Sequence, residues 1–472
     1  MGSGLILKDL SNFSIINKIL FIIKISNYLK IRKLLKKKYI FLFATSFSGL
    51  FLNNFAEATV LNNSYKEVID HVWQIVYRDF LDSSGKFQKS NWINLRKEVL
   101  SKTYSDSNEA YDAIRDMLSN LDDSYTRFLE PKEFNQMRID TSGELTGVGI
   151  QIVKDKESDD LIIISPIEGT PAFDAGIKAR DKILSIDDIS TEGMNIEEAV
   201  KLIRGQRGTK VKLEILRGSQ SFFKTLSREK IEIKSVSSKV NQTKNGLSIG
   251  YVRIKQFNAN ASKETRDAIK DLETKKVAGY VLDLRSNPGG LLESSIDISR
   301  HFINKGVIVS TVSKDGLKET KKGNGQALTK KPLVVLVNEG SASASEIVSG
   351  AIKDNKRGKL VGKKTFGKGL VQSMRTLVDG SGLTVTVAKY LTPNGTDINK
   401  SGIIPDIEVR MNINPILQRE IGTRKDKQYR AGEKELINII NRKNKISEFN
   451  PDTTNLNAFL KINKEDKVFS LN

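Results

Sequence analysis

The spacing of apolar side chains changes twice along the chain, and three segments are therefore predicted to differ in structure. Between residues 64 and 140, apolar positions recur every three or four residues, as at Val68, Val72 and Val76. This period is typical of amphipathic helices, and Ala110–Leu118 repeats it. The first segment is predicted to be helical, with a polar turn followed by aromatic residues at Leu121–Phe128.

The second segment, residues 143–218, has short apolar runs separated by glycines, as is typical of strands joined by tight turns. One helix is predicted at Asn195–Ile203. The predicted strands are Gly149–Val153, Leu161–Ile164, Lys182–Ile186 and Val211–Leu216. Roughly 80 residues are enough for one compact domain, so this segment is predicted to be a β-rich module.

From residue 246 onward, buried strands alternate with helices. Continuous apolar runs at Val277–Leu284 and Pro332–Val337 predict strands, and helices are predicted at Leu291–Ile303 and Ala344–Lys353. This order indicates stacked βαβ units, which place functional groups at the carboxyl ends of the strands. Beyond residue 412 the sequence is polar and helical, and it ends in a tail rich in Lys and Asn.

The composition excludes several kinds of catalytic and metal-binding site. A chain of 472 residues can hold roughly two to four domains. It has no cysteine, which excludes thiol nucleophiles, disulfides and cysteine-bound metals. His71 and His301 stand alone, far from the spacing of histidine metal sites. A histidine-bound metal is therefore not expected. The serine–lysine chemistry considered below also requires no metal or cofactor.

The net charge of +20 is shared between a basic N-terminus and the rest of the chain. Residues 1–58 hold nine Lys or Arg and two acidic residues, which leaves +13 for the remainder. The uncharged run Tyr39–Leu52 follows basic residues and precedes Ala56-Glu-Ala58. This pattern predicts a secretory signal cleaved near Ala58, with an uncleaved anchor as the alternative. Either would place the rest of the protein across a membrane from the cytosol.

Three serines follow the second buried strand. Ser341, Ser343 and Ser345 lie in Asn338–Glu346 (NEGSASASE), where a nucleophile is possible. Ser343 and Glu346 also have the spacing of a helix capping box, which is the structural alternative. The Gly-x-Ser-x-Gly elbow of the α/β-hydrolases is absent.

A lysine between two glycines is the second candidate. Gly362–Gly369 (GKKTFGKG) resembles a phosphate-binding loop, but Gly369 stands where such a loop needs Ser or Thr. Strands, rather than a helix, are predicted after Lys368, so nucleotide binding is rejected. A serine paired with a lysine base is an established nucleophilic arrangement.

A third segment could supply backbone donors. Asp283–Gly290 (DLRSNPGG) ends the first buried strand. Successive glycines after Pro288 leave backbone N–H groups free to point into a cleft, where such donors stabilise an oxyanion.

The β-rich module resembles a PDZ domain of the bacterial, circularly permuted kind. The resemblance rests on Gly147-Val-Gly-Ile150, on Ser165–Ala172 and Ala175–Ile186, and on the helix before Arg204. In that fold the N–H groups of Gly147, Val148, Gly149 and Ile150 would bind a peptide carboxylate, and the strand edge would accept the extended peptide. The alternative is that the two glycines only shape a turn.

Together these motifs resemble the carboxyl-terminal processing peptidases, or tail-specific proteases, from about Val68 to Val409. DLRSNPGGLL, VNEGSASASEI, VGKKTFGKGLVQ and TVAKYLTPNG occur in that family's order. The resemblance implies a multidomain α/β protein with a crotonase-like ββα protease core, an inserted PDZ domain and helical terminal segments. The implied division is 1–58 signal, 59–140 helical domain, 141–226 PDZ domain, 227–412 protease core and 413–472 helical segment and tail.

The same resemblance assigns roles. Ser343 would be the nucleophile and Lys368 its general base, with Gln372 orienting the lysine. Glu346 would support the site, and the N–H groups of Gly289 and Ala344 would form the oxyanion hole. For Lys368 to act near neutrality, its amine needs burial away from carboxylates.

The expected partners are protein substrates with accessible C-termini, including membrane-associated ones. Ala110–Pro131 and Thr141–Gly149 look most like cyanobacterial and plastid members, which mature the photosystem II reaction-centre precursor in the thylakoid lumen. A general periplasmic tail-specific protease and a silent PDZ scaffold or chaperone are the alternatives. Nucleic-acid binding is not expected, because the charge is scattered and no such module is recognisable.

Overall fold

The computed structural model describes residues 65–155, 157–410 and 420–448. The predicted signal around Tyr39–Leu52 and the tail after residue 448 lie outside these ranges. Within them, no helix combines the length and the apolar character needed to cross a membrane.

A six-stranded sheet forms the centre of the protease segment. Its first two strands are antiparallel, and each later strand lies parallel to its neighbour. Helices follow three of the parallel strands, which is the alternation that the apolar runs predict. The strand order is β10 (Val236–Gln242), β11 (Ser248–Ile254), β12 (Gly279–Asp283), β15 (Leu333–Val337), β16 (Lys359–Gly362) and β19 (Ile407–Glu408).

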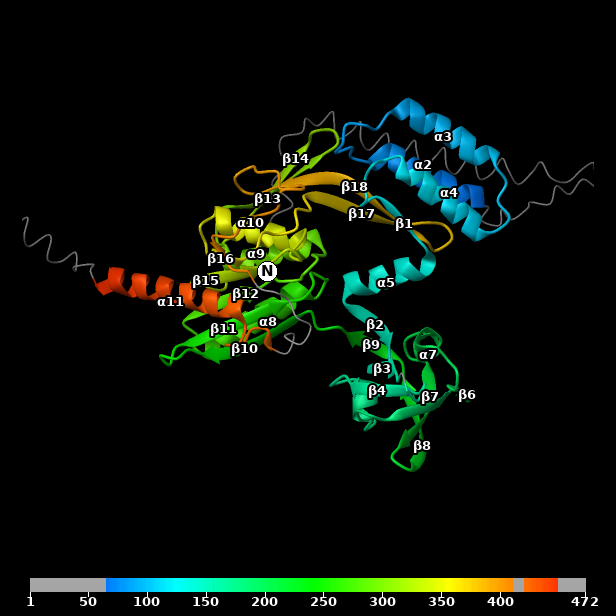
Figure 1. Cartoon of the computed structure of the whole chain (residues 1–472), viewed down its shortest axis with the longest axis horizontal. Helices are drawn as coiled ribbons and strands as arrows, with labels where there is room; N and C mark the ends of the chain where they lie inside the picture. The colour runs from blue at the N-terminus through cyan, green and yellow to red at the C-terminus, as the bar shows by residue number, and fades with distance from the viewer. Residues whose placement is uncertain (1–64, 156, 411–419, 449–472) are drawn as a thin grey trace, which may run out of the picture. The chain divides into compact units, whose positions relative to one another are not determined.

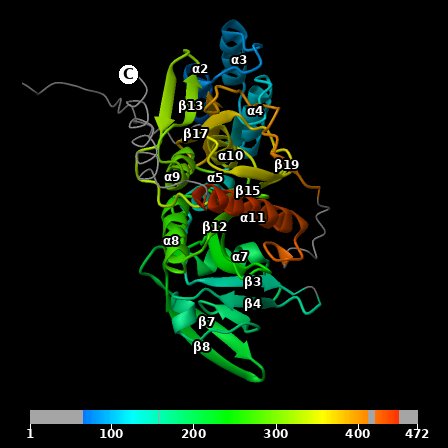
Figure 2. The same ribbon diagram turned by 90° about the vertical axis from the view of Figure 1, so that its left-hand side faces the viewer.

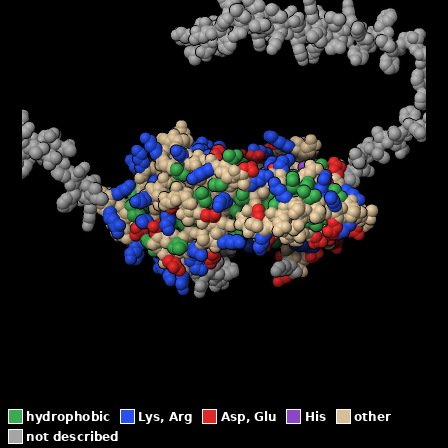
Figure 3. All heavy atoms as spheres, turned by 90° about the horizontal axis from the view of Figure 1, so that it is seen from above, with side chains coloured by type: hydrophobic (Ala, Val, Ile, Leu, Met, Phe, Trp, Pro, Cys, Tyr) green, Lys and Arg blue, Asp and Glu red, His purple; other side chains and the backbone are tan. Residues whose placement is uncertain are grey.

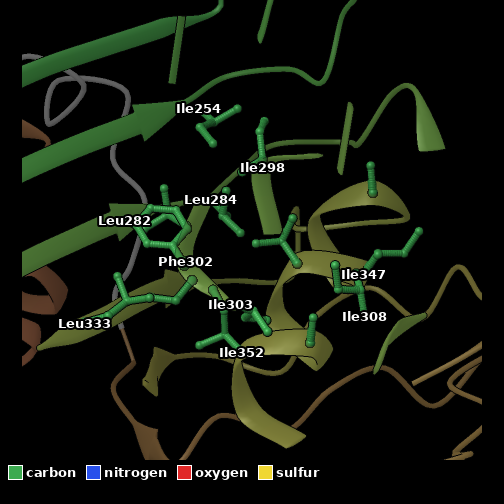
Figure 4. Packing of buried hydrophobic residues seen from close by; sticks show 14 of the residues in the cluster. Ile254, Leu282, Leu284, Ile298, Phe302, Ile303, Ile308, Leu333, Ile347 and Ile352 are labelled. Carbon is green, nitrogen blue, oxygen red and sulfur yellow. The ribbon is translucent and has the colours of Figure 1, made fainter. Parts of the chain in front are cut away.

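Both faces of this sheet are covered, because alternate side chains of its central strands enter different cores. Leu333, Val335 and Val337 pack in a core (Figure 4) with helices α8 (Ala261–Thr274), α9 (Leu292–Phe302) and α10 (Ala344–Asp354). Val334 and Leu336 point to the opposite face. There they meet Tyr429 and Leu436 of α11 (Lys427–Glu448), which lies across the strands (Figure 2).

A second, antiparallel sheet joins the N-terminal helices to the protease segment. The strands are β1 (Arg127–Leu129), β13 (Val307–Ser313), β14 (Lys318–Lys322), β17 (Leu370–Thr376) and β18 (Gly382–Leu391). The helices α2 (Tyr65–Asp79), α3 (Lys89–Ser101) and α4 (Ser107–Ser119) lie on the side of this sheet where β18 and β1 are (Figure 1). They share a core with Leu383 and Val385 of β18. The helical segment is therefore completed by strands that lie much later in the sequence.

The β-rich module has its own sheet and its own core. The chain enters it along β2 (Glu144–Gly147) and leaves along β9 (Glu229–Glu232), and these two strands pair with each other. The module is thus an insertion whose two ends lie side by side. Its elements are β3 (Ile150–Lys154), β4 (Leu161–Pro166), α6 (Pro171–Asp174), β5 (Lys182–Ile186), β6 (Ile189–Ser190), α7 (Ile196–Ile203), β7 (Lys210–Arg217) and β8 (Gln220–Ser227). The helix α5 (Pro131–Ser142) precedes it.

Charged side chains are mixed on the surface. Figure 3 shows Lys and Arg scattered among Asp and Glu over the visible face of the described residues. No single basic stripe crosses that face, in keeping with the charge distribution inferred from the sequence.

A buried ion network ties the start of α11 to the sheet. Arg285 donates to Asp283 and Asp426, and the Tyr251 hydroxyl donates to Asp283. All four side chains are almost inaccessible to solvent. Burial alone would raise the pKa of Asp426, but its hydrogen bonds and charge interaction with Arg285 outweigh burial and hold that pKa below its usual value.

Replacing Asp426 by Ala should lower the free energy of unfolding by about 3–5 kcal/mol, because it leaves the buried Arg285 with half of its counter-charge. Denaturant unfolding of the wild type and the variant measures this. Asp267→Ala, which breaks the exposed pair with Lys263, is the control and should change stability little. Equal effects of the two substitutions would contradict a structural role for the network.

Candidate active site

The three segments singled out in the sequence meet at one edge of the central sheet. Each follows a parallel strand: Asp283–Gly290 follows β12, Asn338–Ser345 follows β15 and Gly362–Gly369 follows β16. Because these strands are neighbours, their carboxyl ends converge. One cleft is lined by Gly289, Ser343, Ala344, Lys368 and Gln372, among others.

Only one of the three candidate serines is open to this cleft. Ser341 and Ser345 are fully buried, and their hydroxyls donate to the carbonyl oxygens of Leu284 and Asn287. Ser343 is half-buried and lines the cleft. Its φ of 54° and ψ of −113° lie in a region that residues with a side chain seldom adopt, and such strain is concentrated at functional sites.

The carboxylate of Glu346 links the segments of Ser343 and Lys368. Its Oε2 accepts from the backbone N–H groups of Ser343 and Lys368, both at 2.9 Å. Its Oε1 accepts from the Thr365 hydroxyl at 2.6 Å and from the Gly367 N–H at 2.7 Å. Glu346 is fully buried. The predicted capping box is present, and the same carboxylate also holds the lysine loop.

Tyr390 completes this link from the carbonyl side. Its hydroxyl lies 2.5 Å from the carbonyl oxygen of Lys368 and 3.2 Å from that of Ser343. Burial raises the pKa of Tyr390 well above its usual value, so the phenol keeps its proton and remains a donor. Ser343 and Lys368 are thus joined through both their N–H and their C=O groups. We call Glu346 and Tyr390 the backbone clamp.

The amine of Lys368 lies in a pocket that disfavours its charge. Burial is the main cause of a lowered pKa, and the positive charge of Arg127 adds to it. Asp123 and Glu346 act in the opposite direction, but the net shift is downward. The sequence argument required burial away from carboxylates. The structure shows instead that burial and Arg127 outweigh two nearby carboxylates.

The structure brings the predicted catalytic side chains into one cleft but does not join them by hydrogen bonds. Within the described residues, no hydrogen bond links Ser343 Oγ to Lys368 Nζ. Gln372 donates from Nε2 to Thr386 Oγ1 at 3.4 Å and does not bond to Lys368. Catalytic hydrogen bonds are often long before substrate binds, so the roles of Ser343, Lys368 and Gln372 stay predictions.

The predicted oxyanion donors lie together, but one of them already has a partner. A Cβ added to Gly289 would lie 2.9 Å from Ser343 Cβ and 3.0 Å from Ala344 N, so this loop packs directly against Ser343. The Gly289 N–H donates to Asn287 Oδ1 at 2.9 Å. Within the described residues the N–H groups of Ala344 and Gly290 have no hydrogen-bond partner.

In the β-rich module the predicted carboxylate-binding loop connects β2 to β3. Gly149 has a φ of 81°, and a Cβ there would lie 2.2 Å from Thr170 Oγ1, so the turn itself requires glycine. Among the described residues, the N–H groups of Val148 and Gly149 find no acceptor. The strand β3, which begins at Ile150, is an edge of the sheet. The loop thus has the free donors and the open edge that peptide binding needs.

Several residues around the site were missed by the sequence analysis. Tyr390 and Thr386 lie in the quoted TVAKYLTPNG motif and in β18, but their spacing indicates only a strand. Asn287 lies in the quoted DLRSNPGG motif but shows its role only through its contact with Gly289. No spacing rule could have identified Tyr390 and Thr386, because each acts through a contact with a distant segment.

Comparison with known proteins supports one family. The sequence profile of peptidase family S41 matches residues 248–409, and that of the PDZ domain matches residues 162–217. The chain is 43% identical over 386 residues to the carboxyl-terminal-processing protease of Synechocystis sp., covering 81% of this chain and 89% of that relative. The chain belongs to the carboxyl-terminal processing peptidases. It is therefore a serine peptidase with a PDZ domain.

A further relative agrees with this assignment. The peptidase is 41% identical over 345 residues to the chloroplastic carboxyl-terminal-processing peptidase 2 of Arabidopsis thaliana, covering 71% of this chain and 67% of that protein. A solved structure of a photosystem II D1 C-terminal processing protease is 37% identical, with a TM-score of 0.48, and covers 73% of this chain and 93% of the other.

The backbone clamp leads to a direct test. Glu346→Gln keeps the shape of the side chain but turns one acceptor oxygen into a donor facing N–H or O–H donors. We expect kcat to fall about 100-fold and stability to fall by about 1–3 kcal/mol. Peptidase kinetics and denaturant unfolding measure both. Glu339→Gln, at an exposed position paired with Lys363, is the matched control. If Glu346→Gln kept the wild-type kcat, the backbone clamp would not be needed for catalysis.

Proposed function

We propose that the peptidase cleaves near the C-termini of protein substrates with Ser343 as nucleophile and Lys368 as general base. The observation that carries this proposal is the position of Ser343. It is the one member of its serine cluster open to the cleft, and the backbone clamp fixes its segment to that of Lys368.

The reaction follows from the chemistry of the two groups. The neutral amine of Lys368 takes the proton of the Ser343 hydroxyl, and the oxygen attacks the peptide carbonyl. The lysine then donates that proton to the leaving amine, and water releases the acyl group from the serine. Gln372 orients the lysine during these transfers.

Two backbone N–H groups would stabilise the oxyanion of the tetrahedral intermediate, those of Gly289 and Ala344. The Ala344 N–H is free for this role, whereas the Gly289 N–H must first leave Asn287 Oδ1. We infer that substrate binding exchanges this bond.

Two further proposals concern the fold of the protease segment and the peptide-binding loop of the β-rich module. The arrangement of the protease segment is proposed to be crotonase-like, as the family resemblance implies. The β2–β3 loop at Gly147, Val148, Gly149 and Ile150 is proposed to bind the substrate's terminal carboxylate, with the peptide pairing along the edge of β3. The free N–H groups of the loop support this role.

For the substrate, we propose the precursor of the photosystem II reaction-centre protein, processed in the thylakoid lumen or an equivalent periplasmic space. The resemblance of Ala110–Pro131 and Thr141–Gly149 to cyanobacterial and plastid members supports this choice, and the Synechocystis and chloroplastic relatives are such members. A general tail-specific protease of the periplasm is the second candidate, since the sequence resemblance fits both.

Ser343→Ala and Lys368→Ala should each abolish cleavage of a peptide with an apolar free C-terminus, lowering kcat/KM by at least about 10⁴-fold, while the fold stays intact. Ser341→Ala is the matched control within the same loop and should keep measurable activity, because Ser341 is buried away from the cleft. Activity in Ser343→Ala would move the nucleophile elsewhere. Inactivity of the wild type would favour a silent PDZ scaffold.

Recognition of the C-terminus predicts a difference between two forms of one peptide. Amidating the C-terminal carboxylate removes the charge that the N–H groups of Val148 and Gly149 would bind, so KM should rise about tenfold with little change in kcat. Steady-state kinetics of the free and amidated peptides measure this. Equal KM values would contradict carboxylate binding by the loop.

A further inference from the structure

The loop between α4 and β1, residues Leu121–Arg127, reaches the amine of Lys368 from the N-terminal helical segment. Its end is fixed to the protease strands, because Arg127 in β1 pairs with Thr384 in β18. The Thr384 hydroxyl also donates to the carbonyl oxygen of Tyr125 at 2.8 Å. The loop is thus held against the strand that lies next to β17 and Gln372.

Tyr125 contacts the lysine directly. The Lys368 Nζ lies 4.6 Å from the centroid of the Tyr125 ring, over its face, and both residues line the same cleft. A ring face in this position attracts an ammonium and shields an amine from water. Tyr125 therefore limits where the amine can lie and how much water reaches it.

Asp123 lies two residues before Tyr125 and makes the second set of contacts. Its Oδ2 accepts from the hydroxyls of Thr126 at 2.7 Å and Thr386 at 2.6 Å, and its Oδ1 accepts from the Tyr125 N–H at 3.1 Å. Thr386 is fully buried, and its Oγ1 accepts from Gln372 Nε2. A chain of hydrogen bonds therefore runs from Asp123 through Thr386 to Gln372.

The donor and acceptor directions of these hydrogen bonds decide which end of the Gln372 amide is free to bind another group. A threonine hydroxyl has one proton, and Thr386 gives it to the carboxylate of Asp123. Its oxygen can then only accept from the amide, so the NH₂ end of Gln372 turns toward Thr386. The oxygen Oε1 is left for another donor. A protonated lysine amine has N–H donors and no acceptor. It can therefore bind the Oε1 end of the Gln372 amide but not the NH₂ end.

We propose that this loop positions the base: the Tyr125 ring confines the Lys368 amine, and Asp123, acting through Thr386, fixes the amide of Gln372 with its oxygen toward the lysine. The inference rests on the proposed function, because it assumes that Lys368 is the base. It makes the N-terminal helical segment part of the catalytic machinery.

The charges that face Lys368 give the proposal a signature in the pH profile. Burial lowers the pKa of Lys368, Arg127 lowers it further, and Asp123 and Glu346 raise it. Removing the charge of Asp123 should lower this pKa further, so the acidic limb of kcat/KM moves to lower pH. Removing the Tyr125 ring admits water and relieves the burial effect, which is the largest cause of the lowered pKa. This change outweighs the lost attraction of the ring face for the ammonium, so the acidic limb moves to higher pH.

The test compares hydroxyl and ring substitutions in the full chain. We expect Thr386→Val to lower kcat about tenfold or more, with KM nearly unchanged, and Thr386→Ser, which keeps the hydroxyl, to recover most of the rate. Tyr125→Ala should lower kcat and shift the limb upward, and Tyr125→Phe, which keeps the ring, should shift it little. Asp123→Asn should lower kcat and shift the limb downward. Thr376→Val, at an exposed position of β17, should match the wild type.

The outcomes separate this inference from the proposed function. If Ser343→Ala and Lys368→Ala are inactive but Thr386→Val, Tyr125→Ala and Asp123→Asn keep the wild-type kcat and pH limb, the positioning role is wrong and the dyad stands. If Ser343→Ala keeps activity, the proposed function itself fails. Should Thr386→Val not fold, the Tyr125 pair and Asp123→Asn decide. If the acidic limb of the kcat/KM pH profile did not move in these variants, the inference would be overturned.

Discussion

One buried carboxylate sets the geometry on which the candidate site depends. Glu346 accepts four hydrogen bonds without any exposure to water. A buried charge is tolerated only when its acceptor sites are filled, so the serine loop and the lysine loop must both come to it. Tyr390 makes the matching contacts to their carbonyl groups. The strained backbone of Ser343 is held in place by this arrangement.

The parallel order of the central sheet explains why these loops are neighbours. β12, β15 and β16 run in the same direction with both faces covered, and their carboxyl ends open at one edge. The loops that follow these strands, Asp283–Gly290, Asn338–Ser345 and Gly362–Gly369, can therefore meet although each is short. At Gly289 the approach is so close that a single methyl group would touch Ser343 and Ala344.

Opposing effects act on the pKa of Lys368. Burial and Arg127 favour the neutral amine of Lys368, while Asp123 and Glu346 favour the charged one. Each carboxylate is held by hydrogen bonds from other groups, Asp123 by Thr126 and Thr386 and Glu346 by the clamp contacts. The pocket around Lys368 is therefore formed by the N-terminal loop as well as by the protease strands. The core shared by α2–α4 and β18 holds this loop against those strands.

The sequence by itself determined the elements and the motifs. Periodicity located α10, β12, β15 and the module strands β3, β4 and β7 to within a few residues, and β5 at the predicted bounds, because local spacing reflects burial on one face or two. The module strands β6 and β8 were not predicted. The motifs indicated the family and the three loops. Only the tertiary structure decided which serine is open to the cleft and which partner already occupies the Gly289 N–H. It also decided that Tyr390 contacts the Lys368 carbonyl, Tyr125 the Lys368 amine and Thr386 the Gln372 amide. These depend on contacts between segments far apart in the chain, and no local pattern encodes where such segments meet.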